Sequence, residues 1–398
     1  MNPTNATNPS TMFRQQLPAL LLFTLIFFVN FLSRIFLAPF LPSVEADLSL
    51  SHADAGAFFL LISLGYFMTL LCSGFISSHL THRRTVVVSN LAIGLTLIVI
   101  SFCHSLWSLR LGFLALGMAA GPYFPSGMAS FTTLIDSRHW GKAIGIHELA
   151  PNLALVLAPL ISALILQRLT WRPAFLMLGV LALLIGAVFM RIGRGGEFRG
   201  KAVGYAAYRG FLISPRFWLL VLLFCLGISG TLGLYTMLPL YLVSVHDLSP
   251  ETANTLLALS RVSGIVMVLA AGWAVDRFSP KTVLRLVFGL SGLMTVPIGL
   301  ASTNWVVVLI FLQPLAAVCF FPAGLAAFAA ISKPEERNIA LSLMVPIAFL
   351  VGGGAVPALI GLAGDLNAFG IGFALTGLAV FTGALLVGGV KMDNAPRD

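Results

Sequence analysis

The feature that most constrains this chain is a series of long apolar blocks separated by short polar breaks. Each block holds roughly 20 to 28 residues, which is enough for a helix to cross a hydrocarbon core of about 30 Å. Only 9% of the residues are charged, against about 25% in an average soluble domain, so a water-soluble surface cannot be assembled. We therefore predict an all-α membrane protein, because helices satisfy their backbone hydrogen bonds within the segment that crosses the lipid.

Twelve membrane-spanning helices are predicted between the polar breaks, near residues 17–40, 54–77, 85–104, 106–133, 141–166, 172–192, 216–243, 251–276, 282–301, 303–331, 337–362 and 368–390. With this layout, 18 of the 23 Lys and Arg residues fall on the side that holds both termini, 3 on the other side and 2 within the membrane. Cytoplasmic loops carry the excess of basic residues, so both termini are predicted to be cytoplasmic. We expect the protein in a bacterial inner (plasma) membrane.

The chain divides into two similar halves around a basic central segment. The predicted parts are a tail, a six-helix half, a linker, a second six-helix half and a tail, at residues 1–16, 17–192, 193–215, 216–390 and 391–398. The segment Tyr123–Gly127 recurs as Phe320–Gly324, displaced by 197 residues, and a second motif recurs with a displacement of 198. Nearly equal displacements at separate places indicate an internal duplication.

The second repeated motif lies in the turns after the second and eighth spans, and its residues are Gly74, Arg83 and Arg84 in the first turn and Gly272, Asp276 and Arg277 in the second. With Lys281, these turns resemble the G-x-x-x-D-R-x-G-x-K/R signature of the major facilitator superfamily, although Ser78 stands where the family has Asp. The resemblance implies two six-helix halves related by pseudo-two-fold symmetry, which rock about a site near the middle of the membrane. It also implies that the turn residues take part in gating.

A narrower resemblance lies in the first two spans. The run Asn30-Phe31-Leu32-Ser33-Arg34 is similar to the N-Y-x-D-R start of the anion:cation symporter branch, and Tyr66 stands at the second-span tyrosine of that branch. Ser33 replaces the branch's Asp, and Phe113 and Ala120 replace its fourth-span Arg and Glu. The resemblance implies an anionic substrate near Arg34.

Three ionisable side chains are predicted inside spans, at Arg34, Glu148 and Arg261. A charge inside a membrane helix costs about 2.5–3.5 kcal/mol on insertion scales and usually faces a cavity or a partner. The planar guanidinium group of arginine matches a carboxylate with two parallel hydrogen bonds. Two arginines and one acid leave one positive charge over, which an anionic substrate could neutralise. The alternative is that each arginine pairs with a protein acid or caps free backbone carbonyls.

Glu148 stands next to His147 in the fifth span, shortly before Pro151. A carboxyl group in such a setting can exchange a proton near physiological pH, so we assign Glu148 and His147 to proton coupling. Adjacent helical residues point about 100° apart, so both cannot face one cavity, and we favour Glu148. The alternative is a structural contact with a neighbouring helix. Other polar side chains at mid-depth complete the candidate substrate-binding set, namely Asn30, Tyr66, Tyr123 and Gln313.

Composition and motifs also argue against several classes of function. The basic residues are dispersed through short loops, which is not typical of a nucleic-acid partner. The sequence has no P-loop, no His/Cys metal motif and no insertion that could hold a catalytic domain, so we expect no cofactor and no enzyme activity. The favoured function is a monomeric secondary transporter that carries a small organic anion, such as a monocarboxylate or a sugar acid, together with protons. The alternatives are proton-driven efflux of amphipathic drugs or metabolites, and a membrane sensor on a transporter scaffold.

Overall fold

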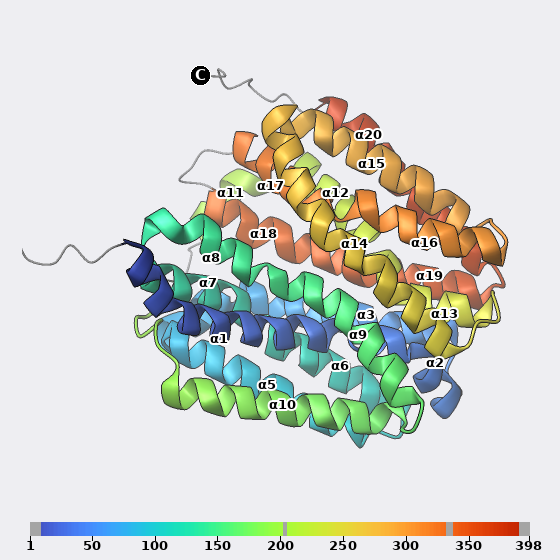
Figure 1. The fold of residues 1–398 in the computed structure, drawn as a ribbon, viewed down its shortest axis with the longest axis horizontal. Coiled ribbons are helices and arrows are strands. Elements are labelled where there is room, and N and C mark those ends of the chain that lie inside the picture. Colours follow the sequence, from blue (N-terminus) through green and yellow to red (C-terminus); the bar gives the residue numbers. More distant parts are fainter. Residues whose placement is uncertain (1–8, 202–204, 332–336, 390–398) are drawn as a thin grey trace, which may run out of the picture.

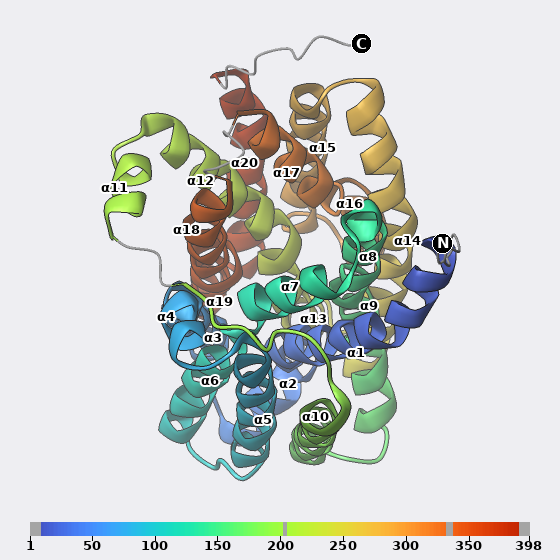
Figure 2. The same ribbon diagram turned by 90° about the vertical axis from the view of Figure 1, so that its left-hand side faces the viewer.

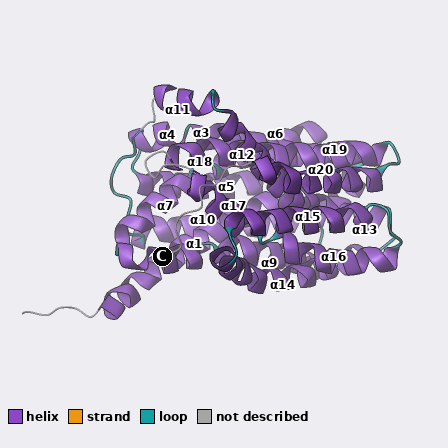
Figure 3. Ribbon diagram, turned by 90° about the horizontal axis from the view of Figure 1, so that it is seen from above, coloured by secondary structure: helices purple, strands orange, loops and turns teal. Residues whose placement is uncertain are grey.

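The computed structural model describes residues 9–201, 205–331 and 337–389, and within these ranges the chain is helical, without a strand (Figures 1 and 3). Most helices run along the long axis of the molecule and are joined by short turns (Figure 3). Among the described residues, eleven helical segments are long and apolar enough to cross a membrane. The prediction of an all-α membrane protein is therefore confirmed.

The first half of the chain forms the helices α1 Pro9–Ile35, α2 Leu37–Leu48, α3 His52–Leu71, α4 Ser73–His79, α5 His82–Ser101, α6 Leu106–Ala120, α7 Tyr123–Leu134, α8 Trp140–His147, α9 Leu149–Leu166 and α10 Trp171–Ile192, with a 3-10 turn at Ser137–His139. The fourth predicted span is divided into α6 and α7 at Gly121 and Pro122. Proline cannot donate a helical hydrogen bond, which accounts for the break. Together α6 and α7 form the fourth span, which brings the number of spans from eleven to the predicted twelve.

The first span is longer than predicted at both ends. α1 includes the described residues from Pro9 onward, which lie inside the predicted tail 1–16. At the other end, α2 continues to Leu48 beyond the predicted end at 40, after a break at Phe36. The polar residues of this extension are paired within the protein, since Glu45 forms an ion pair with His52 at 2.5 Å. The hydropathy pattern could not show this pairing.

The second half forms the helices and π-helical turns α11 Tyr205–Leu212, α12 Pro215–Ile228, η2 Ser229–Gly233, α13 Leu234–Ser244, α14 Pro250–Arg277, α15 Pro280–Ile298, α16 Thr303–Ala317, α17 Phe320–Ile331, α18 Arg337–Leu350, η3 Val351–Ala355, α19 Val356–Asp365 and α20 Phe369–Gly389. The short helix α11 lies within the predicted linker 193–215 and packs against α12 and α18. The predicted tail 391–398 lies outside the described residues.

The helices form two bundles that lie side by side, with most of α1–α10 in the lower part and most of α12–α20 in the upper part of Figure 1, and Figure 2 views the molecule from one side. Within the bundles, α5 packs on α10 and α15 packs on α20. Between the bundles, α3 contacts α18, η3 and α19, while α9 contacts α14 and α2 contacts α13. Two six-helix halves with a shared interface are the arrangement that the resemblance implied.

The two halves are joined closely at one end of the molecule, which we call the capped end. There Asp365, the last residue of α19, accepts hydrogen bonds from the backbone N–H groups of His52 and Ala53 at 2.8 and 3.2 Å, and so caps the first turn of α3 from the other half. Gly361 lies so close to α3 that a Cβ atom at this position would be 2.2 Å from the His52 carbonyl oxygen. The opposite end, where α1 begins and α20 ends, is called the terminal end.

The segment after α10 lies along the terminal end of the first half. The Gly200 N–H donates to the Ser77 carbonyl at 2.9 Å, and the Arg83 N–H donates to the Gly196 carbonyl at 2.8 Å. Gly195 and Gly196 have positive φ angles of 94° and 78°, which glycine adopts without strain. This part of the linker is therefore fixed to the turn between α4 and α5.

Candidate functional site

Arg34 lies in the last turn of α1, at the interface between the halves, and is 8% exposed. Its guanidinium carbon is 4.3 Å from the ring centroid of Tyr66 in α3 and 5.0 Å from that of Phe31. From the other half, the ring of Phe349 in α18 approaches to 5.4 Å. Aromatic faces attract a cation, so three rings hold the guanidinium group in place without neutralising its charge.

Arg34 opens onto a pocket formed by both halves, and the lining residues are Arg34, Ile35, Phe59, Ile62, Ser63, Tyr66, Leu232, Thr236, Phe349 and Gly353. The first six come from α1 and α3, and the other four come from η2, α13, α18 and η3. In this conformation the pocket is narrow and has room for only about one water molecule, so the two halves must move apart before an organic anion can enter.

No protein group neutralises Arg34 in the part of the chain that the structure describes. Its guanidinium group makes no ion pair and no hydrogen bond there, and its Nε atom is buried without a partner. The hydroxyl of Tyr66 likewise has no hydrogen-bond partner among the described residues. A buried charge is costly unless a partner compensates it, and a guanidinium group in a pocket offers its planar donors to an anion.

Arg261 resembles Arg34 in its surroundings but lies elsewhere. It comes from α14, is 7% exposed, and its guanidinium carbon is 5.0 Å from the ring centroid of Tyr235 in α13. Its Nε atom is also buried without a partner, and no ion pair forms with it within the described ranges. The Tyr235 hydroxyl donates to the Leu155 carbonyl of α9 at 3.1 Å, across the two halves. Arg261 does not line the pocket around Arg34.

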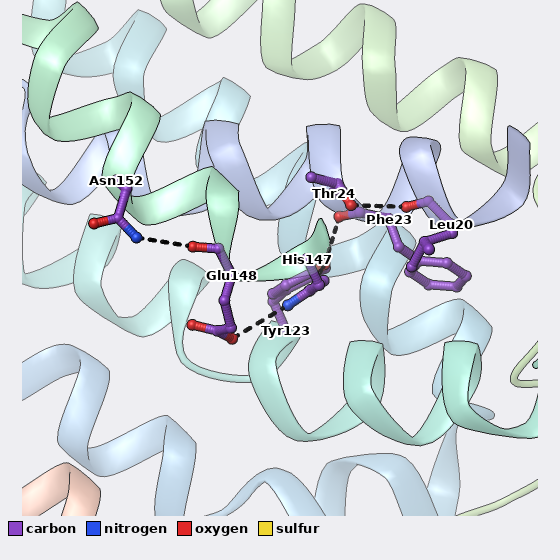
Figure 4. Close-up of polar contacts among 7 residues, drawn as sticks. All are labelled: Leu20, Phe23, Thr24, Tyr123, His147, Glu148 and Asn152. Carbon is purple, nitrogen blue, oxygen red and sulfur yellow. Dashed lines mark hydrogen bonds and ion pairs between the residues drawn. The ribbon is translucent and has the colours of Figure 1, made fainter. Parts of the chain in front are cut away.

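The fifth span breaks between α8 and α9, and Glu148 occupies the break (Figure 4). The side chain of Glu148 is 48% exposed, whereas His147 is fully buried. The ring of His147 stacks on that of Phe27, with centroids 4.3 Å apart and planes 8° apart. The two neighbouring side chains therefore occupy different environments, although one Glu148 carboxylate oxygen lies 3.4 Å from Nδ1 of His147.

The contacts of Tyr123 favour one position for the imidazole proton of His147. The Tyr123 hydroxyl donates its hydrogen to the Phe23 carbonyl at 2.7 Å, and its oxygen lies 3.2 Å from Nε2 of His147 (Figure 4). The oxygen can then only accept, which assigns the hydrogen of a neutral imidazole to Nε2. Nδ1 and the Glu148 carboxylate would face each other with lone pairs alone, unless a proton lies between them. The separation of 3.4 Å between Nδ1 and the carboxylate oxygen leaves room for one hydrogen between the two groups.

Two other predicted substrate contacts are engaged by backbone carbonyls. The Asn30 side-chain amide donates to the Ala120 carbonyl at 2.9 Å, beside the break between α6 and α7. The Gln313 amide donates to the Gly230 carbonyl at 2.7 Å, within the π-helical turn η2. Neither residue lines the pocket, and both satisfy carbonyls at irregular places in a helix.

The predicted gating residues all lie at the terminal end of the molecule. Arg83 at the start of α5 donates from its guanidinium group to the Met190 carbonyl at the end of α10, at 3.0 Å. Arg84 lies beside it in the first turn of α5, and Gly74 is in α4. The second copy of the motif, with Gly272, Asp276 and Arg277, forms the last turns of α14. Asp276 and Arg277 are exposed in this conformation.

Several pocket residues were missed by sequence reasoning. Phe349, Thr236 and Ser63 line the pocket, and Tyr235 lies against Arg261. Uncharged side chains of these types are common within apolar spans, so the sequence does not single them out. Phe349 comes close to Arg34 only because one half packs on the other. One available signal was the run Gly352–Gly354, because η3 at this run places Gly353 in the pocket wall. Among the described residues, no group of three His, Cys, Asp or Glu side chains could hold a metal ion.

Comparison with known proteins settles the family. Residues 23–302 and 246–398 match the family described as Major Facilitator Superfamily. The chain belongs to the Major Facilitator Superfamily. This membership confirms the resemblance drawn from the turns at Gly74 and Gly272, and it describes an integral membrane protein of a transporter family.

Individual relatives of this superfamily member are distant in sequence. It is 25% identical over 279 residues to the Cupriavidus necator protein called "Probable sulfoacetate transporter SauU", covering 65% of this chain and 64% of that protein, just under two thirds of its length. It is 24% identical to the membrane sensor protein UhpC of Salmonella typhimurium, covering 72% of this chain and 69% of the sensor.

A solved structure shares the fold at 16% identity and a TM-score of 0.80, with 96% of each chain covered. That structure is of a bacterial homologue of the human lysosomal transporter Spinster, in an inward-facing and occupied conformation. At this identity the likeness concerns the fold alone.

Proposed function

We propose that this protein is a secondary transporter that moves a small organic anion across the membrane by alternating access. The observation that carries the proposal is Arg34, a buried arginine in the pocket between the halves that has no anionic partner among the described residues. Neither structural alternative for this arginine is met there, since it neither pairs with an acid nor caps a carbonyl. An incoming carboxylate or sulfonate would supply the missing charge.

The relatives are compatible with this substrate class. One is named for transport of sulfoacetate, a small organic anion. Alternating access also agrees with an interface in which the contacts of Asp365 and Gly361 close one end of the molecule. The pocket would then open alternately toward the terminal end and the capped end.

We further propose that a proton moves in the same direction as the anion, bound between Glu148 and His147. Support comes from the 3.4 Å separation of the carboxylate and Nδ1, and from the imidazole tautomer that the contact with Tyr123 favours. The 48% exposure of the Glu148 side chain leaves one member of this pair open to its surroundings. Two groups that share one proton can release it when the halves change their packing.

The proposal includes an orientation and an assembly state. The basic residues at the terminal end suit the cytoplasmic side of a bacterial inner membrane, so both termini would be cytoplasmic. A single chain contains both halves of the pocket, so a monomer would suffice for transport.

The test measures flux and proton movement together in proteoliposomes that contain the full chain. Radiolabelled sulfoacetate, lactate and gluconate would be offered outside, with a pH dye in the external buffer and the membrane potential clamped. We expect uptake of at least one anion with external alkalinisation, and its loss in Arg34→Gln but not in Arg216→Gln, an exposed arginine of α12. Uptake of a lipophilic cation that survives Arg34→Gln, without anion uptake, would refute the anion proposal in favour of efflux.

Glu148→Gln separates the coupling from the transport itself. Glutamine keeps the size of the side chain but cannot bind a proton, so this variant should still exchange labelled anion across the membrane while the alkalinisation disappears. If the variant shows the same ratio of protons to anions as the parent protein, Glu148 does not carry the coupling proton.

A membrane sensor is the second candidate, favoured by the similarity to UhpC. A sensor would bind an anion at Arg34 and change conformation without carrying the anion across. Saturable binding in detergent combined with zero flux in proteoliposomes, for every anion that binds, would select this candidate.

A further inference from the structure

The pocket around Arg34 contains few groups that can bond to a ligand. Five lining side chains are hydrocarbon, namely Ile35, Phe59, Ile62, Leu232 and Phe349. The polar members other than Arg34 are the hydroxyl groups of Ser63, Tyr66 and Thr236, and the hydrogen of the Thr236 hydroxyl is donated to the Gly233 carbonyl at 3.0 Å. No carboxylate or amide side chain belongs to the described lining.

This composition limits the number of polar groups that a bound ligand can carry. Arg34 can satisfy one carboxylate, and the hydroxyls of Ser63 and Tyr66, which have no hydrogen-bond partner among the described residues, can serve one or two more atoms. A sugar acid carries a hydroxyl on almost every carbon. Each hydroxyl that leaves water without finding a partner opposes binding, whereas apolar surface placed against the same wall favours it.

The aromatic rings beside Arg34 add to this preference. Phe349 and Tyr66 approach each other with ring centroids 5.8 Å apart and an interplanar angle of 57°. They come from opposite halves, so a ligand bound to Arg34 would meet an aromatic surface from each side of the interface. Aromatic edges and faces pack well against flat apolar groups.

We propose that the site selects organic acids with one negative charge and an apolar body, such as aromatic or branched aliphatic monocarboxylates, over polyhydroxylated sugar acids. The inference rests on the proposed function, since it specifies the ligand of the same pocket. Arg34 holds the carboxylate, and the five hydrocarbon side chains select the rest of the molecule.

The test compares binding of benzoate and gluconate, which carry the same charge and differ in the body. Binding is measured by calorimetry on the full chain in lipid nanodiscs at pH 7.5, because benzoic acid crosses bilayers unaided and would obscure an uptake assay. We expect benzoate to bind with a Kd at least about tenfold lower than that of gluconate, in line with the discrimination that a few contacts provide. Benzoate binding should be lost in Arg34→Gln.

A pair of variants at Leu232 examines the wall directly. Leu232→Asn places an amide in the hydrocarbon wall and should reduce the preference for benzoate by about fivefold or more, whereas Leu232→Met keeps the wall apolar and should retain the preference. The comparison of benzoate with gluconate in the parent protein tests the proposal even if Leu232→Asn does not fold.

The possible results separate this inference from the function on which it rests. Gluconate binding that equals or exceeds benzoate binding and requires Arg34 would overturn the apolar selectivity and leave the anion transporter intact. If neither acid, nor any other anion of the uptake panel, binds in a manner that requires Arg34, both proposals are wrong.

Discussion

The two halves of the protein each contain a buried arginine that lies over a tyrosine ring. The order of the two residues along the chain is reversed between the halves. In the first half, the arginine is in the first span and the tyrosine in the second, as Arg34 and Tyr66. In the second half, the tyrosine precedes the arginine, as Tyr235 in α13 and Arg261 in α14. Each arginine has a buried Nε atom that finds no partner among the described residues.

The two pairs differ in what their tyrosine hydroxyls do. The Tyr235 hydroxyl donates to the Leu155 carbonyl of the other half, whereas Tyr66 lines the pocket and its hydroxyl has no partner among the described residues. The comparison suggests that similar pairs have taken different tasks. We propose that Arg34 and Tyr66 bind a ligand, whereas Tyr235, which packs against Arg261, joins the halves in this conformation through its hydroxyl.

The largest effect is expected when the charge is removed from the pair in the pocket. Arg34→Gln should weaken anion binding by roughly 10- to 150-fold, because a hydrogen bond to a charged group contributes about 1.5–3 kcal/mol. Calorimetric titration with the transported anion would measure this loss. Arg34→Lys keeps the charge but loses the planar donors, so its affinity for the anion should lie between those of the parent protein and Arg34→Gln. Unchanged affinity in Arg34→Gln would contradict the assignment.

Removing the charge from the second pair, Arg261 and Tyr235, should alter the rate of transport and not the affinity for the anion. Arg261→Gln should leave the binding affinity within about threefold of the parent value while changing the transport rate by about tenfold, because Arg261 packs on the ring of Tyr235, whose hydroxyl joins the two halves in this conformation. Equilibrium binding and initial uptake rates, measured on the same preparation, would show the split. An affinity loss as large as that of Arg34→Gln would mean that both arginines bind the substrate.

The smallest effect concerns the tyrosine hydroxyls. Tyr235→Phe removes one hydrogen bond between the halves, which contributes about 0.5–1.5 kcal/mol, and should speed opening of the capped end by roughly 2- to 10-fold. Hydrogen exchange at the amides of His52 and Ala53 reports that opening, because Asp365 binds both.

Tyr241→Phe provides the matched control for this measurement. The Tyr241 hydroxyl donates to the Ile298 carbonyl within the second half, at 3.0 Å, so its loss should leave the exchange of His52 and Ala53 unchanged. Equal acceleration in both variants would show that general destabilisation, and not the bond between the halves, is responsible.

Sequence reasoning succeeded for the spans because lipid imposes a simple requirement on them. A helix must be apolar along the length that crosses the membrane, and the blocks found in the sequence meet that condition. It was wrong about the extent of the first span, since Glu45 of α2 is paired by His52, a residue that follows the turn. Local hydropathy contains no information on such pairing.

The candidate site was only partly accessible for a related reason. Arg34 and Tyr66 could be singled out because a charge and a hydroxyl are rare within apolar spans, and the structure places them together. Asn30 and Gln313 were singled out on the same ground, yet their amides are bonded to carbonyls at helix irregularities. Polarity within a span does not distinguish a residue that serves a ligand from one that repairs a helix. Phe349 was missed because its proximity to Arg34 exists only after the halves pack.

The contact of Gly361 with α3 also has a practical consequence for the study of this protein. Around the position that a Cβ atom would occupy, the nearest atoms are backbone atoms of His52 and Ala53, which cannot move aside as a flexible side chain can. A residue larger than glycine at position 361 is therefore compatible only with separated halves at the capped end. One substitution thus provides a route to a homogeneous sample of the opposite conformation for structure determination, without an inhibitor or a stabilising antibody.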